Sequence, residues 1–335
     1  MTFGAGPDAD DETDAGKGVL AVDSGGSGLR IALGSAGRGA LGRRSSTVAV
    51  RTGPRGIDPV HLMEQLVPLV RSLAAETDAP PPTTAVVGAA GLATLGDALR
   101  AELPSALARE FGVRTTALAA DAVTAYAGAL GERPGAVVAA GTGLIAVGTD
   151  LTAWQRADGW GHLLGDCGSG AWIGRAGLEA ALRAHDGRPG GSTALLARAE
   201  ERFGPVAGLP GRLYPRPDRP AVLASFAPPV AECAQDDPAA AGILHTAARH
   251  IAESAAAVCP PGGEPLVALT GGLFALGAPL LVPLEEELAR RLPHALRAPA
   301  EGDPLDGAVR IAVGLATGML DLPHEETLLS VLPSV

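Results

Sequence analysis

Two segments with the same residue pattern, one in each half of the chain, constrain the fold more than any other feature. The first runs from Val19 to Leu33 and carries the turn Ser24-Gly25-Gly26-Ser27-Gly28 between two apolar runs. The second runs from Ala136 to Val147 and carries the turn Gly141-Thr142-Gly143. Glycine tolerates the backbone angles of tight turns, so each segment is predicted to be strand, turn, strand. The chain therefore repeats one supersecondary unit.

The glycine turns allow two interpretations. Each can be a plain hairpin connection, which is a frequent use of glycine. Alternatively, successive bare N–H groups and the Ser27 hydroxyl face an anion. Asp23, at the end of the first strand, is then placed to hold Mg²⁺ through a water molecule. A third glycine turn, Thr270-Gly271-Gly272, follows the apolar run from Pro265 to Leu269.

Helix and strand patterns alternate over much of the chain. Further strands are expected at Thr47–Val50, Ala85–Val87 and Thr115–Leu118, and helices at 96–111, 237–258 and 304–320 and from Asp58 and Asp121 onward. Strands followed by alternating helices and strands predict an α/β protein with mixed sheets flanked by helices. A length of 335 residues favours two domains.

Composition excludes several classes of protein. The net charge of -11 argues against nucleic-acid binding, which needs a basic surface. Residues 1–17 form an acidic, Gly- and Asp-rich leader that we expect to be disordered and that lacks the pattern of a signal peptide. No apolar stretch is long enough to predict a membrane span. The three cysteines are far apart, which favours a reduced, cytoplasmic setting over a disulfide framework.

Two absences limit the chemistry. Lys17 is the only lysine and lies in the leader, so the folded part has neither a GxxxxGK[ST] phosphate loop nor a Schiff-base lysine. Any phosphate must therefore be bound by backbone N–H groups, hydroxyls, arginine or a metal ion. The chain also contains no asparagine.

The segment from Gly159 to Gly174, GWGHLLGDCGSGAWIG, is rich in glycine and carries two tryptophans, a histidine and Asp166. One interpretation is a glycine-rich turn whose tryptophans belong to the core. The other is a loop shaped around a ligand, with aromatic walls, just before a helix.

These motifs together resemble a known family. The order of the strand–DxGGSG–strand, strand-end Asp121, strand–GTG–strand and late TGG turn resembles the actin-like ATPase fold, in which two ribonuclease H-like halves close on ATP. The segment GWGHLLGDCGSGAWIG is similar to the sugar loop of the N-acetylglucosamine kinases, in the BadF/BadG/BcrA/BcrD ATPase family. The resemblance implies domains at 18–120 and 121–335, with the last helix (304–320) packing back on the first domain.

The resemblance also implies roles for individual residues. Asp121 becomes the general base, for which the alternative is a helix N-cap. Asp23 becomes the Mg²⁺-water partner. The remaining implied contacts are to ATP, by Gly25, Gly26, Ser27, Gly141, Thr142, Gly143, Gly271 and Gly272, and to the sugar, by Gly159, Trp160 and Asp166.

Two departures concern the sugar. Cys167 stands where the family has a glutamate, and the family's sugar-binding asparagine has no counterpart; Arg51 falls at or near its position. If Arg51 contacts the sugar, the pocket gains a fixed positive charge that favours an acidic substituent. Alternatively, Arg51 points to solvent or pairs with a nearby acidic residue.

The resemblance favours an ATP- and Mg²⁺-dependent kinase for an amino sugar, most simply N-acetylglucosamine at its 6-hydroxyl. N-acetylmuramate and glucosamine are alternative substrates. The alternatives from other classes are an activator ATPase with an iron–sulfur cluster, which needs cysteines placed elsewhere, and a non-catalytic sugar or nucleotide sensor. Whether the chain forms a homodimer stays open.

Overall fold

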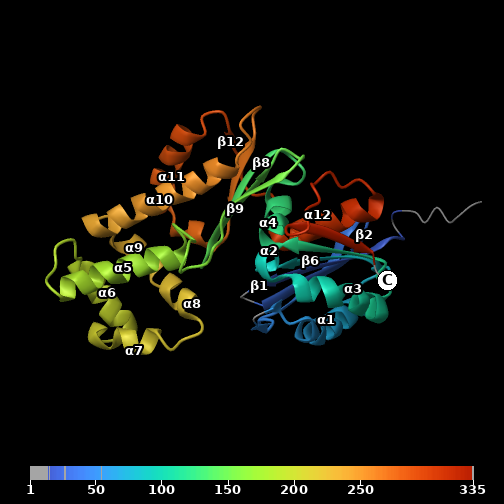
Figure 1. Ribbon diagram of the computed structural model, residues 1–335, viewed down its shortest axis with the longest axis horizontal. Helices are drawn as coiled ribbons and strands as arrows, with labels where there is room; N and C mark the ends of the chain where they lie inside the picture. Colours follow the sequence, from blue (N-terminus) through green and yellow to red (C-terminus); the bar gives the residue numbers. More distant parts are fainter. Residues whose placement is uncertain (1–13, 15, 26–27, 54, 334–335) are drawn as a thin grey trace, which may run out of the picture. The chain divides into compact units, whose positions relative to one another are not determined.

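The computed structural model describes residues 14, 16–25, 28–53 and 55–333 (Figure 1). The chain forms two compact units. Unit 1 comprises the described residues up to Glu132 and those from Gly302 onward, and unit 2 comprises Arg133–Glu301. No helix within the described residues is both long and apolar enough to cross a membrane.

Unit 1 is built on a six-stranded mixed sheet in the order β13-β7-β6-β1-β2-β3. Strands β1, β6 and β7 are parallel, and the other neighbours pair antiparallel. The strand bounds are β1 (Gly18–Gly25), β2 (Gly28–Ser35), β3 (Gly39–Ser46), β6 (Pro82–Ala89), β7 (Thr115–Ala120) and β13 (Leu329–Pro333), with a separate small pair, β4 (Thr52–Gly53) and β5 (Gly56–Ile57).

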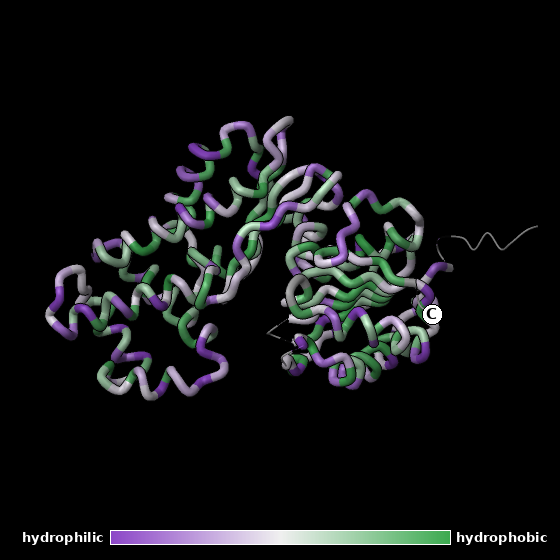
Figure 2. Tube along the Cα trace, viewed as in Figure 1, coloured by the Kyte–Doolittle hydropathy of each residue, from purple (hydrophilic) through white to green (hydrophobic). Residues whose placement is uncertain are grey.

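Helices cover both faces of this sheet (Figure 1). Their bounds are α1 (Pro59–Ala74), α2 (Leu92–Leu95), α3 (Asp97–Phe111), α4 (Asp121–Leu130) and α12 (Pro304–Thr317). One face packs on α1 and α3. On this face Leu20 and Val22 of β1 share a buried cluster with Leu62 and Leu66 of α1. The other face packs on α12, which contacts β1 and β6. Figure 2 shows the apolar strands at the centre of unit 1.

Helix α1 illustrates why these elements form. Asp58 is its N-cap and accepts hydrogen bonds from the N–H groups of Val60 and His61, and Pro59 opens the first turn. The buried apolar residues then recur at helical spacing, through Leu62 and Leu66 to Leu73. The helix predicted to begin at Asp58 is confirmed.

The strand predicted at Thr47–Val50 is wrong. The third strand of the sheet is β3, eight residues upstream, and Thr47–Val50 lies outside regular structure. The sequence of β3, GALGRRSS, is polar and glycine-rich because β3 is an edge strand with much of its surface in water. Apolar periodicity therefore does not mark it. Val48, which belongs to the mispredicted segment, is exposed.

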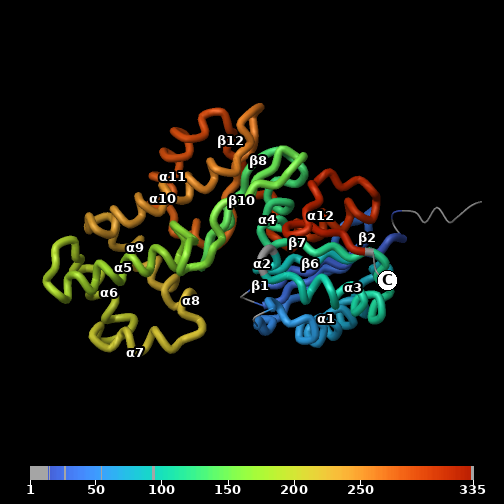
Figure 3. Tube along the Cα trace, viewed as in Figure 1, coloured from blue at the N-terminus to red at the C-terminus, as the bar shows by residue number. Residues whose placement is uncertain are grey.

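The chain's last helix lies beside elements from its first half (Figure 3). Helix α12 packs against α4 as well as β1 and β6, so both helices belong to unit 1. The boundary was expected between residues 120 and 121, whereas unit 1 continues through α4 to Glu132 and also includes the chain from Gly302 onward. The physical reason is that α4 buries its apolar surface against unit 1.

Unit 2 contains a five-stranded sheet in the order β10-β9-β8-β11-β12. Its strands are β8 (Gly135–Ala140), β9 (Leu144–Thr149), β10 (Trp154–Asp158), β11 (Leu266–Thr270) and β12 (Leu296–Arg297). Its helices are α5 (Gly170–His185), α6 (Thr193–Phe203), α7 (Leu209–Leu213), α8 (Arg219–Ala224), α9 (Ala227–Cys233), α10 (Pro238–Val258) and α11 (Ala278–Arg291), with short 3₁₀ turns η1 (Val206–Gly208) and η2 (Gly272–Leu276). The predicted α/β fold with two mixed sheets is confirmed.

Candidate functional site

The carboxyl edge of the unit 1 sheet brings Asp23 and Asp121 to the same side. Asp23 is near the end of β1, and Asp121 follows β7 directly. Only β6 lies between them, since Asp23 pairs with Gly88 and Gly88 pairs with Ala119. Neighbouring strands are about 4.8 Å apart, so the backbones of β1 and β7 are separated by roughly 10 Å. The predicted base and the predicted metal partner therefore share one edge, two strands apart.

Asp121 is the first residue of α4, and Ala120 occupies the N-cap position. The Oδ1 atom of Asp121 accepts a hydrogen bond from the N–H of Ala122 at 2.9 Å. A carboxylate in the first turn of a helix is stabilised by the helix dipole. The position therefore supports the helix and leaves the side chain at the sheet edge.

Asp23 is held by an arginine that the sequence did not single out. Arg30 lies opposite Asp23 in the β1–β2 pair and donates two hydrogen bonds to its Oδ2 atom, from Nη2 at 2.6 Å and from Nε at 2.9 Å. Burial raises the pKa of the Asp23 carboxyl above its ordinary value, and Arg30 acts in the opposite direction. The sequence signal for this pair is its spacing: each residue lies two positions from the Gly25–Gly28 pair at the end of the hairpin, so the two face each other across the strands.

The first glycine turn is described only at its ends. Gly25 is the last residue of β1 and pairs with Gly28 of β2. The predicted phosphate contacts Gly26 and Ser27 lie outside the described residues.

The second glycine turn is anchored on helix α5. The N–H of Gly141 donates to the carbonyl of Gly143 at 2.9 Å, which closes the turn. The carbonyls of Gly141 and Thr142 accept hydrogen bonds from the N–H groups of Gly170 and Ala171, at 2.9 and 3.1 Å. The first residues of α5 therefore fix the position of the turn between β8 and β9.

The third glycine turn lies beside the second one. Gly271 has φ of +102°, and a Cβ atom there would lie 2.3 Å from the carbonyl oxygen of Ala140. Only glycine fits this conformation and this close approach. Gly271 and Gly272 come directly after β11, and the turn Gly141–Gly143 comes directly after β8. Because β11 runs parallel to β8, both turns lie at the same edge of the sheet. The predicted ATP contacts of unit 2 are thus brought together.

The loop after β10 is closed by Asp158, a residue that the sequence analysis missed. Its Oδ1 accepts the N–H of Asp166 at 2.6 Å, and its Oδ2 accepts the N–H of Cys167 at 2.8 Å. Asp158 has φ of +60° and Asp166 has φ of +52°. Aspartate adopts this left-handed region more readily than most residues. The available signal was an aspartate at the strand end, directly before the glycine-rich loop.

Asp166 connects the loop to the second glycine turn. The residue is buried, at 8% exposure, and a Cβ atom on Gly143 would lie 2.7 Å from its Oδ2. Its Oδ1 accepts the N–H of Gly161 at 3.1 Å. Burial raises the pKa of Asp166, the N–H of Gly161 lowers it, and the charge of Asp158 raises it further.

Trp160 projects from the same loop. Its side chain is 62% exposed, and the guanidinium of Arg156 lies over its ring, 4.6 Å from the centroid. Arg156 also donates to the carbonyls of Asp158 and Gly159, at 3.2 and 2.9 Å. Arg156 therefore ties the start of the loop to the indole and leaves one face of Trp160 accessible.

Arg51 forms an ion pair with Glu64 of α1 at 3.6 Å, and both side chains are mostly exposed. Its backbone N–H donates to Nδ1 of His61 at 2.8 Å. Of the two interpretations of Arg51, this contact favours pairing with an acidic neighbour.

The residues of unit 1 fit a metal ion that is held mainly by nucleotide and water. Among the described residues, no three His, Cys, Asp or Glu side chains are arranged to hold a metal. Mg²⁺ in kinases keeps several waters and takes one or two carboxylates. Both hydrogen bonds to Asp23 converge on Oδ2, and within the described structure Oδ1 has no hydrogen-bond partner. The Oδ1 atom of Asp23 can thus accept a hydrogen bond from a metal-bound water.

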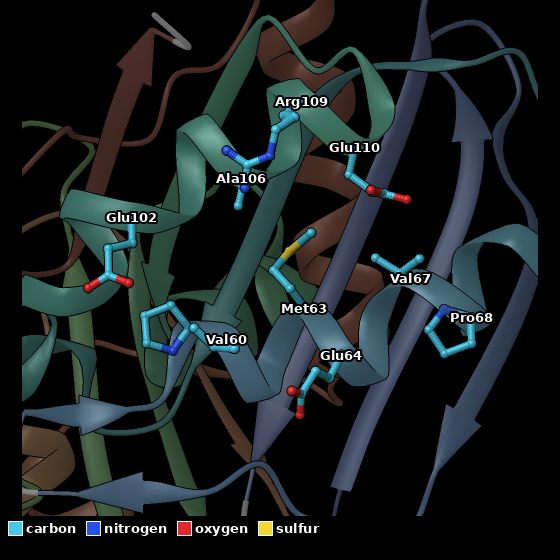
Figure 4. A pocket seen from close by; sticks show the side chains of 10 residues that line it. Val60, Met63, Glu64, Val67, Pro68, Glu102, Ala106, Arg109 and Glu110 are labelled. Carbon is cyan, nitrogen blue, oxygen red and sulfur yellow. The ribbon is translucent and has the colours of Figure 1, made fainter.

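A large cavity in unit 1 lies away from these residues. It measures about 620 Å³ and is formed between α1 and α3, where Val60, Met63 and Val67 face Glu102 and Arg109 (Figure 4). None of the predicted site residues lines it. The glycine turns and the carboxylates beside them therefore remain the candidate site.

The BadF/BadG/BcrA/BcrD ATPase family model matches residues 20–307. The chain belongs to this family. A curated relative, the N-acetylmuramic acid/N-acetylglucosamine kinase of Clostridium acetobutylicum, is 44% identical over 69 residues. That match covers 20% of this chain and 22% of the kinase, so it spans less than a quarter of the relative's length.

Solved structures agree with the family assignment. A candidate N-acetylglucosamine kinase from Chromobacterium violaceum has a TM-score of 0.67 at 26% identity, over 88% of this chain and 98% of that one. A second, from Porphyromonas gingivalis, has a TM-score of 0.66 at 18% identity, over 90% and 100%. These similarities confirm the predicted resemblance and the predicted fold of this family member.

Proposed function

We propose that this chain is an ATP-dependent sugar kinase that phosphorylates an amino sugar. The preferred substrate in this proposal is N-acetylglucosamine, phosphorylated at its 6-hydroxyl. The observation that carries the proposal is the contact between Asp166 and Gly143 in unit 2. The loop after β10 lies against the turn Gly141–Gly143. This supports the proposal that the loop binds the sugar and the turn binds phosphate, because a kinase must bind its acceptor beside the phosphates. The names of the Clostridium and Chromobacterium relatives support the choice of sugar.

In this mechanism each residue has a limited task. Asp121 accepts the proton of the attacking hydroxyl. The glycine turns bind phosphate oxygens through backbone N–H groups, and Asp23 orients a metal-bound water. When bound, Mg²⁺ neutralises charge on the phosphate oxygens. Asp166 accepts a hydrogen bond from a sugar hydroxyl, and Trp160 offers its ring to the apolar face of the sugar.

A coupled ATPase assay over N-acetylglucosamine, glucosamine, N-acetylmuramate, N-acetylmannosamine and glucose tests the proposal. We expect the highest kcat/KM with N-acetylglucosamine. N-acetylmuramate is the main alternative, because the name of the Clostridium relative includes both sugars. A protein that binds ATP and phosphorylates none of the five sugars would contradict the proposed function.

Arg51→Asn tests whether Arg51 selects the sugar. Because Arg51 already pairs with Glu64, we expect the variant to keep the wild-type ranking of N-acetylmuramate and N-acetylglucosamine. The measurement is kcat/KM for both sugars in the same assay, with Glu64→Gln as the matched control for loss of the ion pair. A selective loss of activity toward N-acetylmuramate in Arg51→Asn alone would instead make Arg51 a specificity residue.

Sugar affinity should depend on the charge of Asp166. The charged carboxylate accepts the sugar hydroxyl, so affinity falls as pH falls through the pKa of this group. Because burial raises that pKa, the loss should begin at a higher pH than an ordinary aspartate would give. Calorimetric titration of sugar between about pH 4 and 8 measures it. Asp166→Asn should bind weakly and lack this step, and an unchanged step in that variant would assign it to another group.

A further inference from the structure

Arg30 makes a third charged hydrogen bond that the proposed mechanism does not use. Its Nη1 donates to Oδ2 of Asp303 at 2.6 Å, in addition to the two bonds to Asp23. Asp303 is the N-cap of α12 and forms a capping box with Asp306. One guanidinium therefore connects the end of β1 with the start of the chain's last helix, within unit 1.

The geometry limits how the Asp23 carboxylate can turn. Asp23 is 14% exposed, and both bonds from Arg30 end on the same oxygen, Oδ2. Hydrogen bonds between charged groups are stronger than neutral ones, and the planar fork of arginine fixes their direction. The carboxylate is thus held by Oδ2, whereas Oδ1 has no hydrogen-bond partner among the described residues.

We propose that Arg30 is a positioning residue for phosphoryl transfer, which holds Oδ2 of Asp23 so that Oδ1 faces a metal-bound water. The inference rests on the proposed function, because it takes Asp23 as the metal-side carboxylate. Arg30 also places a fixed cation between the carboxylates of Asp23 and Asp303. The charge of Arg30 offsets one of the two negative charges, so these carboxylates alone attract Mg²⁺ only weakly, and we expect Mg²⁺ to bind together with the nucleotide.

The neighbouring pair Arg43–Asp306 provides a matched control. Arg43 lies on β3 and pairs with the capping-box residue Asp306 of the same helix. It is an arginine on the next strand, bound to the same helix start, and it has no bond to Asp23. Loss of Arg43 therefore removes one charge from the network without releasing the Asp23 carboxylate.

The experiment compares Arg30→Gln, Arg30→Lys and Arg43→Gln in the full-length chain. Calorimetry measures the affinity for a non-hydrolysable ATP analogue with Mg²⁺ and with EDTA, and thermal unfolding checks the fold. We expect Arg30→Gln to lower the gain in affinity that Mg²⁺ supplies by about 10- to 100-fold, as for other residues that orient a metal's partners. Affinity in EDTA should change little. Arg30→Lys should lose less of the Mg²⁺-dependent affinity, because lysine keeps the positive charge but lacks the planar guanidinium. Arg43→Gln should match the wild type.

Several outcomes would overturn the inference. They are a wild-type Mg²⁺ gain in folded Arg30→Gln, an equal loss in Arg43→Gln, or a wild-type protein whose nucleotide affinity does not depend on Mg²⁺. If Arg30→Gln unfolds, Arg30→Lys decides, and an unchanged Mg²⁺ gain there rejects the role of the fork. The readout does not involve the sugar, so a wild type that binds Mg²⁺-nucleotide but phosphorylates no sugar contradicts the proposed function alone.

Discussion

Asp121→Asn is expected to lower kcat by about two to four decades, the range for a positioned general base. Asparagine has nearly the same shape but cannot take up a proton. Its amide oxygen can still accept the N–H of Ala122, which Asp121 binds at 2.9 Å. The start of α4 should therefore survive, and the affinities for ATP and sugar should change little. Steady-state kinetics and calorimetry on the same preparation separate the two effects.

Asp97→Asn is the matched control for this variant. Asp97 is also the first residue of a helix in unit 1, but its side chain is fully exposed and pairs with Arg100 at 3.3 Å. We expect wild-type turnover from it. A loss of less than tenfold in Asp121→Asn, or an equal loss in Asp97→Asn, would remove Asp121 from the role of base.

The fold was predictable where apolar runs and glycine turns coincide. The hairpins β1–β2 and β8–β9 have buried strands on both sides of the turn, so the order of apolar runs and glycines is enough to predict them. β3 escaped prediction because a half-exposed edge strand needs no apolar pattern. The place of α4 in unit 1 depends on its packing against α12, a contact between distant parts of the chain.

The same distinction applies to the site. Asp121, Asp166 and the unit 2 turns follow from short motifs, and the structure places the unit 2 set at one sheet edge. Arg30 and Asp303 are 273 positions apart in the sequence, and no local pattern predicts such a pair. Asp158 accepts hydrogen bonds from residues eight and nine positions later in the chain. The path of the loop between them cannot be predicted from apolar periodicity. Sequence therefore indicates groups that can contact ligands better than groups that hold them in place.

Asp158→Asn is expected to weaken sugar binding strongly, although Asp158 is neither the proposed base nor a proposed sugar contact. One of its two carboxylate oxygens becomes an NH₂ group, which then faces the N–H of Asp166 or of Cys167. Loss of a hydrogen bond to a charged group costs about 2–3 kcal/mol, and an opposed donor adds to it. If the loop must be closed to bind sugar, affinity should fall by roughly 30- to 150-fold. Calorimetry with the sugar measures this loss.

Two further measurements show whether the loop is the cause. Hydrogen exchange at the amides of Asp166 and Cys167 should become faster in Asp158→Asn, because these amides donate to Asp158 in the wild type. Asp150→Asn is the control: Asp150 accepts the N–H groups of Thr152 and Ala153 in the turn between β9 and β10, outside the sugar loop. It should keep wild-type sugar affinity. Wild-type affinity in Asp158→Asn despite faster exchange would mean that the sugar closes the loop by itself and that Asp158 does not prepare it.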